Sequence, residues 1–228
     1  MPLRCLEAFL FDLDGTLLDA REAFISSYNY AFRVLGLPPL PSDLQEALRK
    51  IRRPFHEILE SLLPSDYQDG VELERFVADL QYFYGGVFLE QSQLVPGARE
   101  ALRELKARGA KIAVVTARVK LAAYVLPALR HFHLADYIDV VISSKEVGQD
   151  KPSPKPFLEA AKRLQVEPRR CAVVGDSPYD IIGGKRAGMF TIAYANGFFE
   201  EEILLNQKPD MLVRDLREIL KLLQPQPR

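Results

Sequence analysis

After residue 95 the chain alternates between short β-branched runs and segments with helix signals, and this alternation restricts the fold more than any other feature. Each run has about the length of one strand and is predominantly apolar, as expected when helices cover both faces of a sheet. The runs are 110–118, 137–144, 171–176 and 190–195. Strand–helix–strand alternation predicts a parallel sheet with helices on both faces.

An earlier apolar run, residues 6–11, has the same character and is expected to belong to the same sheet. It is separated from the other runs by residues 21–90, in which apolar side chains recur at three- and four-residue steps and no convincing strand is found. We therefore expect an α/β fold with a Rossmann-like parallel core formed by residues 1–16 and 92–228. Residues 17–91 are expected to form an inserted all-helical domain.

Charge and composition argue against nucleic acid and membrane surfaces as partners and indicate where the protein is found. The 228 residues include 30 basic and 31 acidic side chains, so no global positive field attracts nucleic acid or an anionic membrane. No apolar stretch reaches transmembrane length, and the N-terminus lacks a signal-peptide pattern, so a cytoplasmic protein is expected. Cys5 and Cys171 are better interpreted as reduced core thiols than as a disulfide.

Polar side chains follow three of the expected strands, at the edge where open parallel sheets bind ligands. They are Asp12 and Asp14 after the first strand, Thr116 after the second, and Asp176 with Asp180 after the fourth. Converging carboxylates require a hard cation, and oxygen-only ligation suits Mg²⁺. A hydroxyl, the N–H groups at helix starts and Lys151 together suit a phosphate. A shared site for a metal and a phosphoryl group is therefore predicted.

Four motifs occur in an order and spacing that resemble the haloacid dehalogenase-like hydrolase superfamily. They are "DLDGT" from Asp12, "VVTAR" from Val114, "KPSPKPF" from Lys151 and "GDSPYD" from Gly175. The inserted helical domain resembles the helical cap of that superfamily. Residues 94–118 and 174–189 are most similar to its phosphoglycolate phosphatase-like branch. One such motif alone could mark an ordinary strand end, but four together are highly specific.

The resemblance implies a role for each motif residue. Asp12 would be the nucleophile that forms an aspartyl-phosphate, and Asp14 the general acid and then the general base. Mg²⁺ would be held by the Asp12 carboxylate, the Asp14 carbonyl and Asp176, with Asp180 in support. The phosphate would be held by Thr116 and the N–H of Ala117, with Lys151 offsetting negative charge.

Arg52 and Arg53 in the inserted domain allow two interpretations. Neighbouring arginines on a helical domain usually form a solvated face. Alternatively, one of them points into the cleft and pairs with a distal carboxylate or phosphate of the substrate, which would make both residues candidates for substrate specificity.

The resemblance implies a Mg²⁺-dependent phosphatase that acts on a small phosphomonoester such as phosphoglycolate, with a cap that closes over the site. A dehalogenase is disfavoured because dehalogenase members lack the second aspartate, which is present as Asp14. The alternatives are a phosphosugar mutase similar to β-phosphoglucomutase, an inorganic pyrophosphatase, or a regulatory or scaffold member without turnover. The expected partner is a small phosphorylated metabolite, and a monomer is favoured over an oligomer.

Overall fold

The computed structural model of the protein describes residues 6–42, 63–65, 70–117, 125–144 and 146–223. The chain divides into two compact units. One combines residues 1–19 with residues 94–228, and the other is the intervening segment 20–93. Two short strands, β2 (Leu18–Asp19) and β3 (Gln93–Leu94), form a two-stranded sheet where the chain passes from one unit to the other.

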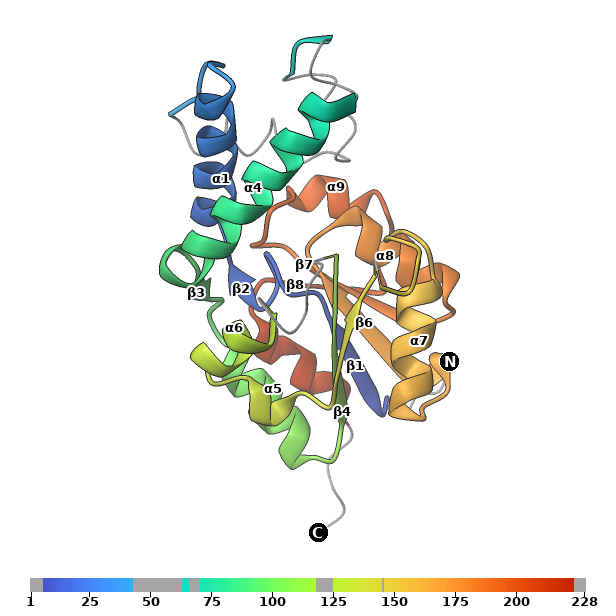
Figure 1. Ribbon diagram of the computed structural model, residues 1–228. Helices are drawn as coiled ribbons and strands as arrows, with labels where there is room; N and C mark the ends of the chain where they lie inside the picture. The colour runs from blue at the N-terminus through green and yellow to red at the C-terminus, as the bar shows by residue number, and fades with distance from the viewer. Residues whose placement is uncertain (1–5, 43–62, 66–69, 118–124, 145, 224–228) are drawn as a thin grey trace. The chain divides into compact units, whose positions relative to one another are not determined.

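The larger unit contains a six-stranded sheet in the order β5-β4-β1-β6-β7-β8, in which every neighbouring pair is parallel (Figure 1). Its strands are β1 (Ala8–Phe11), β4 (Lys111–Thr116), β5 (Val140–Ser143), β6 (Cys171–Gly175), β7 (Phe190–Tyr194) and β8 (Met211–Val213). The first strand along the chain thus lies in the middle of the sheet. The predicted parallel α/β core is confirmed.

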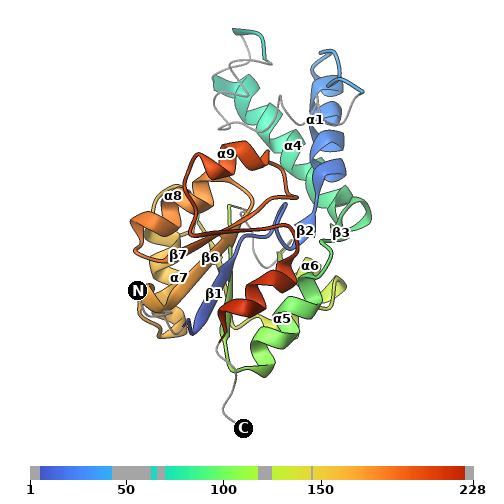
Figure 2. The ribbon, with the colours of Figure 1, turned by 180° about the vertical axis from the view of Figure 1, so that it is seen from behind.

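Helices cover both faces of this sheet, as Figures 1 and 2 show. They are α5 (Ala98–Ala107), α6 (Leu126–His131), α7 (Lys155–Leu164), α8 (Pro178–Arg186) and α9 (Glu201–Leu205), with short 3₁₀ turns η3 (Ala135–Tyr137), η4 (Pro168–Arg170) and η5 (Leu216–Leu222). Helices α7 and α8 lie on one face, and α5 and η5 pack together on the other.

Burial on both faces explains why the strands are predominantly apolar rather than alternating. All four residues of β1 are fully buried. Ala8 and Leu10 share a core cluster with Phe157 of α7, whereas Phe9 and Phe11 point to the opposite face because successive strand residues alternate. The first residue able to present a polar side chain is therefore the one that follows the strand, Asp12.

The smaller unit has an aromatic core between two helices, α1 (Arg21–Val34) and α4 (Gly70–Gln91). Tyr28 and Phe32 of α1 are buried against Phe76 of α4, with ring centroids 6.3 and 5.9 Å from that of Phe76. These are the apolar positions that the helical periodicity marks. The described part of this core is therefore built largely from the regular i, i+3, i+4 spacing of its helices.

Two features of the fold differ from the sequence-based expectation or add to it. The edge strand β8 was not predicted, because three residues give too short a run for a periodicity signal. The strand expected at 137–144 is β5, Val140–Ser143, and it is preceded by the η3 turn. Among the described residues, no helix is long and apolar enough to cross a bilayer.

Candidate active site

The central position of β1 brings two aspartates to adjacent strand ends. Strands β1 and β6 pair with Phe11 opposite Val174, and the Asp12 N–H donates to the Val174 carbonyl at 2.9 Å. Asp176 follows β6 directly, so its side chain emerges beside that of Asp12 at the carboxyl edge of the sheet. The structure thus explains why an acidic residue directly follows each of these two buried strands.

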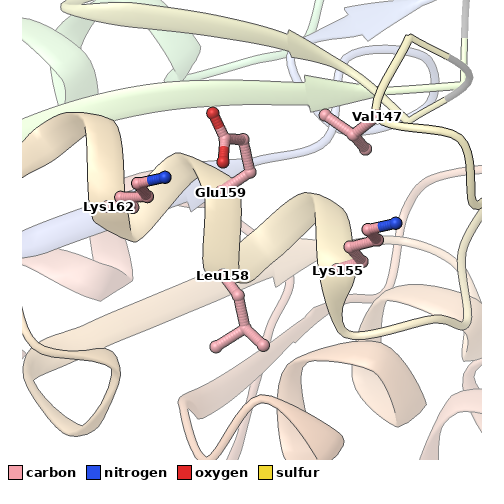
Figure 3. Close-up of a pocket in the computed structure, with 5 residues that line it drawn as sticks. All are labelled: Val147, Lys155, Leu158, Glu159 and Lys162. Atoms are coloured by element: carbon pink, nitrogen blue, oxygen red, sulfur yellow. The ribbon is translucent and has the colours of Figure 1, made fainter.

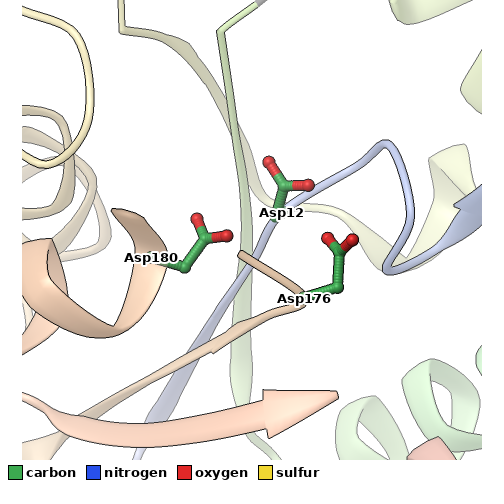
Figure 4. Close-up of side chains that lie close together, drawn as sticks. All are labelled: Asp12, Asp176 and Asp180. Atoms are coloured by element: carbon green, nitrogen blue, oxygen red, sulfur yellow. The ribbon is translucent and has the colours of Figure 1, made fainter. Parts of the chain in front are cut away.

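Three carboxylates meet at this edge (Figure 4). One oxygen each from Asp12, Asp176 and Asp180 lies within 4.8 Å of the others, and all three residues are buried, with relative exposures of 9, 1 and 1%. Like charges at such separations repel strongly away from water, so the cluster requires positive charge to offset it. The donor set consists of carboxylate oxygens, which suits a hard divalent cation.

Lys151 provides part of that positive charge. Its Nζ lies 2.5 Å from Asp12 Oδ1 and 2.7 Å from Asp180 Oδ1, and its side chain is only 8% exposed. Burial alone would lower the pKa of this ammonium, but the charges of Asp12 and Asp180 raise the pKa above its ordinary value. When all three carboxylates are ionised, they and the one ammonium leave a net charge of −2, which one divalent cation would neutralise.

Two carboxylates of the cluster have pKa values above their ordinary range. Burial raises the pKa of Asp12 well above its ordinary value; Lys151 opposes this shift, and the charges of Asp180 and Asp176 add to it. Burial and the charge of Asp180 raise the pKa of Asp176 to about 7, against the hydrogen bonds that this carboxylate accepts. Perturbed values of this kind are typical of functional sites.

Asp180 is held by the start of α8. The Ser177 hydroxyl donates to Asp180 Oδ2 at 2.7 Å, and Ser177 and Asp180 form a reciprocal capping box. A side chain at Gly175 would overlap with that of Asp180. The spacing of "GDSPYD" therefore serves two purposes, because it begins a helix and also places the second oxygen of Asp180 at Lys151.

The other predicted core residues lie at the same edge of the sheet. Asp14 is half-buried in the turn after β1, where the Gly15 N–H donates to the Leu18 carbonyl at 2.7 Å. Thr116 is buried at the end of β4, and Ala117 follows it and is exposed. The three-carboxylate cluster does not include the Asp14 side chain, so the roles of Asp14, Thr116 and Ala117 remain predictions. Arg52 and Arg53 lie outside the described residues.

Three contacts around the site were not anticipated from the sequence. The Thr16 hydroxyl and the Phe198 N–H both donate to Asp176, and the Ser144 hydroxyl donates to the Asp150 carboxylate beside Lys151. Thr16 is part of "DLDGT", and Phe198 follows an Asn-Gly pair after β7, which is a turn signal. Those signals indicate a turn but give no indication of the partner.

A separate hollow lies along α7 (Figure 3). It is lined by Val147, Lys155, Leu158, Glu159 and Lys162. None of these residues belongs to the carboxylate cluster or to the predicted site, and in Figure 3 Leu158 and Glu159 extend from opposite sides of the helix. We assign this hollow no part in the chemistry.

Comparison with known proteins identifies relatives of this chain. The family model described as haloacid dehalogenase-like hydrolase matches residues 9–194. A phosphoglycolate phosphatase of Nitrosospira multiformis is 31% identical over 222 residues, which is 96% of each chain. The pyrophosphatase PpaX of Halalkalibacterium halodurans is 27% identical over 94% of this chain and 95% of its own.

A solved structure has the same fold over almost its entire length. This structure, of a predicted phosphoglycolate phosphatase from Haemophilus somnus, superposes with a TM-score of 0.83 at 26% sequence identity. The superposition covers 96% of this chain and 98% of that one.

Proposed function

The chain belongs to the haloacid dehalogenase-like hydrolase family, and from this premise we propose that it is a Mg²⁺-dependent phosphatase that works through an aspartyl-phosphate on Asp12. The resemblance seen in the four motifs and the prediction of a phosphatase-class enzyme are confirmed by the family match and the phosphatase relatives. The observation that carries the finer proposal is the buried Asp12–Asp176–Asp180 cluster with Lys151 bound between two of its members.

The residues at the cluster fit Mg²⁺. Asp12 and Asp176 would hold the cation with the Asp14 carbonyl, and Asp180 would support them; all of these donors are oxygen atoms. When bound, the cation would offset the charge of the carboxylates and of the phosphoryl group, so that an anionic nucleophile can approach an anionic substrate.

The proposed reaction has two displacements. An Asp12 oxygen attacks phosphorus, the ester P–O bond breaks, and Asp14 gives its proton to the departing alcohol oxygen. Asp14 then takes a proton from water, whose oxygen attacks phosphorus and displaces Asp12 as a free carboxylate. Lys151 would keep Asp12 ionised and aligned, since its ammonium already contacts Asp12 Oδ1.

The rest of the site would bind the phosphate and select the substrate. Thr116 and the N–H of Ala117, at the end of β4, would hold phosphate oxygens. We propose residues 1–16 and 92–228 as the catalytic core and 17–91 as the cap. Within the cap, Arg52 and Arg53 would pair with a second anionic group of the substrate.

Phosphoglycolate is the first candidate substrate, because the Nitrosospira protein is a phosphoglycolate phosphatase over nearly the same length. Inorganic pyrophosphate is the second, because the Halalkalibacterium relative is a pyrophosphatase. A phosphosugar mutase would use the same aspartate but return its phosphate to the product.

The test is phosphate release in the presence of Mg²⁺ from phosphoglycolate, sugar phosphates, nucleotides and pyrophosphate. Asp12→Asn should abolish release, and the exposed Asp136→Asn is the matched control that should retain it. The preferred substrate would identify the function. Release by Asp12→Asn at the wild-type rate would contradict the proposal, and a dependence on a bisphosphate would favour the mutase.

A further inference from the structure

Asp176 is held from two sides by groups outside its own strand. The Thr16 Oγ1 hydroxyl donates to Asp176 Oδ1 at 3.0 Å, and the Phe198 N–H donates to Asp176 Oδ2 at 2.6 Å. Thr16 is fully buried and Asp176 is 1% exposed, so neither contact competes with bulk water. Each carboxylate oxygen therefore has one fixed donor, and the carboxylate plane cannot rotate without breaking both bonds.

Glycines allow these two segments to approach so closely. A Cβ at Gly197 would overlap with the Cβ and carboxylate of Asp176, and a Cβ at Gly15 would overlap with Asp176 Oδ2 and the Phe198 ring. The turn 196–198 reaches Asp176 because β7 is the sheet neighbour of β6, with Gly175 opposite Ala193. Three loops that follow β1, β6 and β7 thus converge on one carboxylate.

We propose that Thr16 and the turn 196–198 are positioning elements that orient Asp176 toward the cation, an inference that rests on the proposed Mg²⁺-dependent function. An oxygen that accepts one N–H or O–H bond keeps a second lone pair for a metal. Two opposed donors select the orientation in which those lone pairs face Asp12 and Asp180. Substitution of such outer partners of metal ligands typically weakens metal affinity or activity about 10- to 100-fold.

Thr16→Val is the direct test of the hydroxyl, because it removes the donor and nearly preserves the side-chain volume. We expect the dissociation constant for Mn²⁺, followed by the electron paramagnetic resonance signal of the free ion, to rise about 10-fold. Thr16→Ser retains the hydroxyl and should remain within about 3-fold of wild type. The Mg²⁺ concentration needed for half-maximal phosphate release should rise in parallel.

Gly197→Ala tests the turn independently, because its added methyl group must displace either Asp176 or the turn. The matched control is Gly86→Ala, where an added Cβ meets nothing within 4 Å. The control should leave Mn²⁺ affinity unchanged. Thermal unfolding of each variant shows whether it is folded, and a misfolded Gly197→Ala leaves the decision to the pair Thr16→Val and Thr16→Ser.

The outcomes separate this inference from the proposed function. If wild type binds Mn²⁺ and releases phosphate, while folded Thr16→Val and Gly197→Ala bind Mn²⁺ as tightly as wild type, the positioning role is wrong and the phosphatase proposal stands. If wild type itself binds neither Mn²⁺ nor Mg²⁺, both are wrong. Weaker Mn²⁺ binding by Thr16→Val with recovery in Thr16→Ser would support the inference.

Discussion

Both units of this chain bury apolar side chains, but among the described residues only the larger unit also buries carboxylates. The larger unit buries four ionisable groups at one edge of its sheet, the Asp12–Asp176–Asp180 cluster and Lys151. The smaller unit buries aromatic rings, among them Tyr28, Phe32 and Phe76. Apolar burial stabilises a fold directly, whereas a buried like-charge cluster opposes it and persists only where other interactions offset the cost. The contrast supports the proposal that the chemistry belongs to the larger unit.

Removing the ammonium of Lys151 should have the largest effect on both activity and stability. Lys151→Met leaves Asp12 and Asp180 buried without their cationic partner, so we expect phosphate release to fall about 10²- to 10³-fold. The free energy of unfolding in urea, without Mg²⁺, should fall by about 3–5 kcal/mol. Lys106→Met is the control, because the Lys106–Asp139 pair is partly exposed and should contribute less than about 1 kcal/mol.

Truncating a ring in the smaller unit should lower stability without changing metal affinity. Phe76 is 1% exposed and contacts two other rings, so Phe76→Ala should lower the free energy of unfolding by about 3–5 kcal/mol. The dissociation constant for Mn²⁺ in the folded protein should not change. Tyr82→Ala, at a side chain that is 76% exposed, is the neutral control. A large loss of Mn²⁺ affinity in Phe76→Ala would show that the two cores are not independent.

The stabilisation of the folded protein by Mg²⁺ should depend on pH, because the larger unit buries titratable carboxylates. Because the folded pKa of Asp176, about 7, lies above its unfolded value, this carboxylate binds more protons in the metal-free folded protein than in the unfolded chain. The contribution of Asp176 to the free energy of unfolding therefore falls as pH rises from about 4 through about 7. Mg²⁺ offsets the ionised carboxylates, so its increase in Tm should be larger at pH 8 than at pH 5.5.

We expect the Mg²⁺-induced increase in Tm to be larger at pH 8 than at pH 5.5 by about 2–4 °C or more. This difference corresponds to about 1 kcal/mol in a chain of this size. Differential scanning fluorimetry with Mg²⁺ and with a chelator at both pH values measures it. An equal shift at the two pH values would contradict the assignment of Asp176 to the cation.

The smallest expected effect is the alkylation of the Cys171 thiol in β6. Burial raises the pKa of Cys171 to about 12, with a further contribution from Glu7, so the thiol should remain protonated and unreactive in the folded protein. Alkylation by iodoacetamide at pH 8 should modify Cys171 in urea but hardly at all in the native state. Rapid native modification, located by peptide mass spectrometry, would show that this part of the sheet opens readily.

The sequence was sufficient for five of the six strands of the core sheet and for the three aspartates of the cluster, because strand ends and motif spacing determine where Asp12, Asp176 and Asp180 emerge. The Phe198 contact could not be predicted, because every residue except proline carries a backbone N–H and no residue type marks the one that is used. Thr16 lies inside a motif, yet its partner is 160 positions away. Long-range contacts of this kind depend on the strand order, which the sequence does not state.

The central claim, that Asp12 becomes phosphorylated, is tested most directly with Asp14→Asn and p-nitrophenyl phosphate. This leaving group needs no protonation, so the first displacement should proceed while the second, which needs a base, should stall. We predict a burst of one p-nitrophenolate per active site and a phosphate adduct on the peptide that contains Asp12, after acid quenching. Turnover without a burst and without that adduct, in wild type and in Asp14→Asn, would contradict the account.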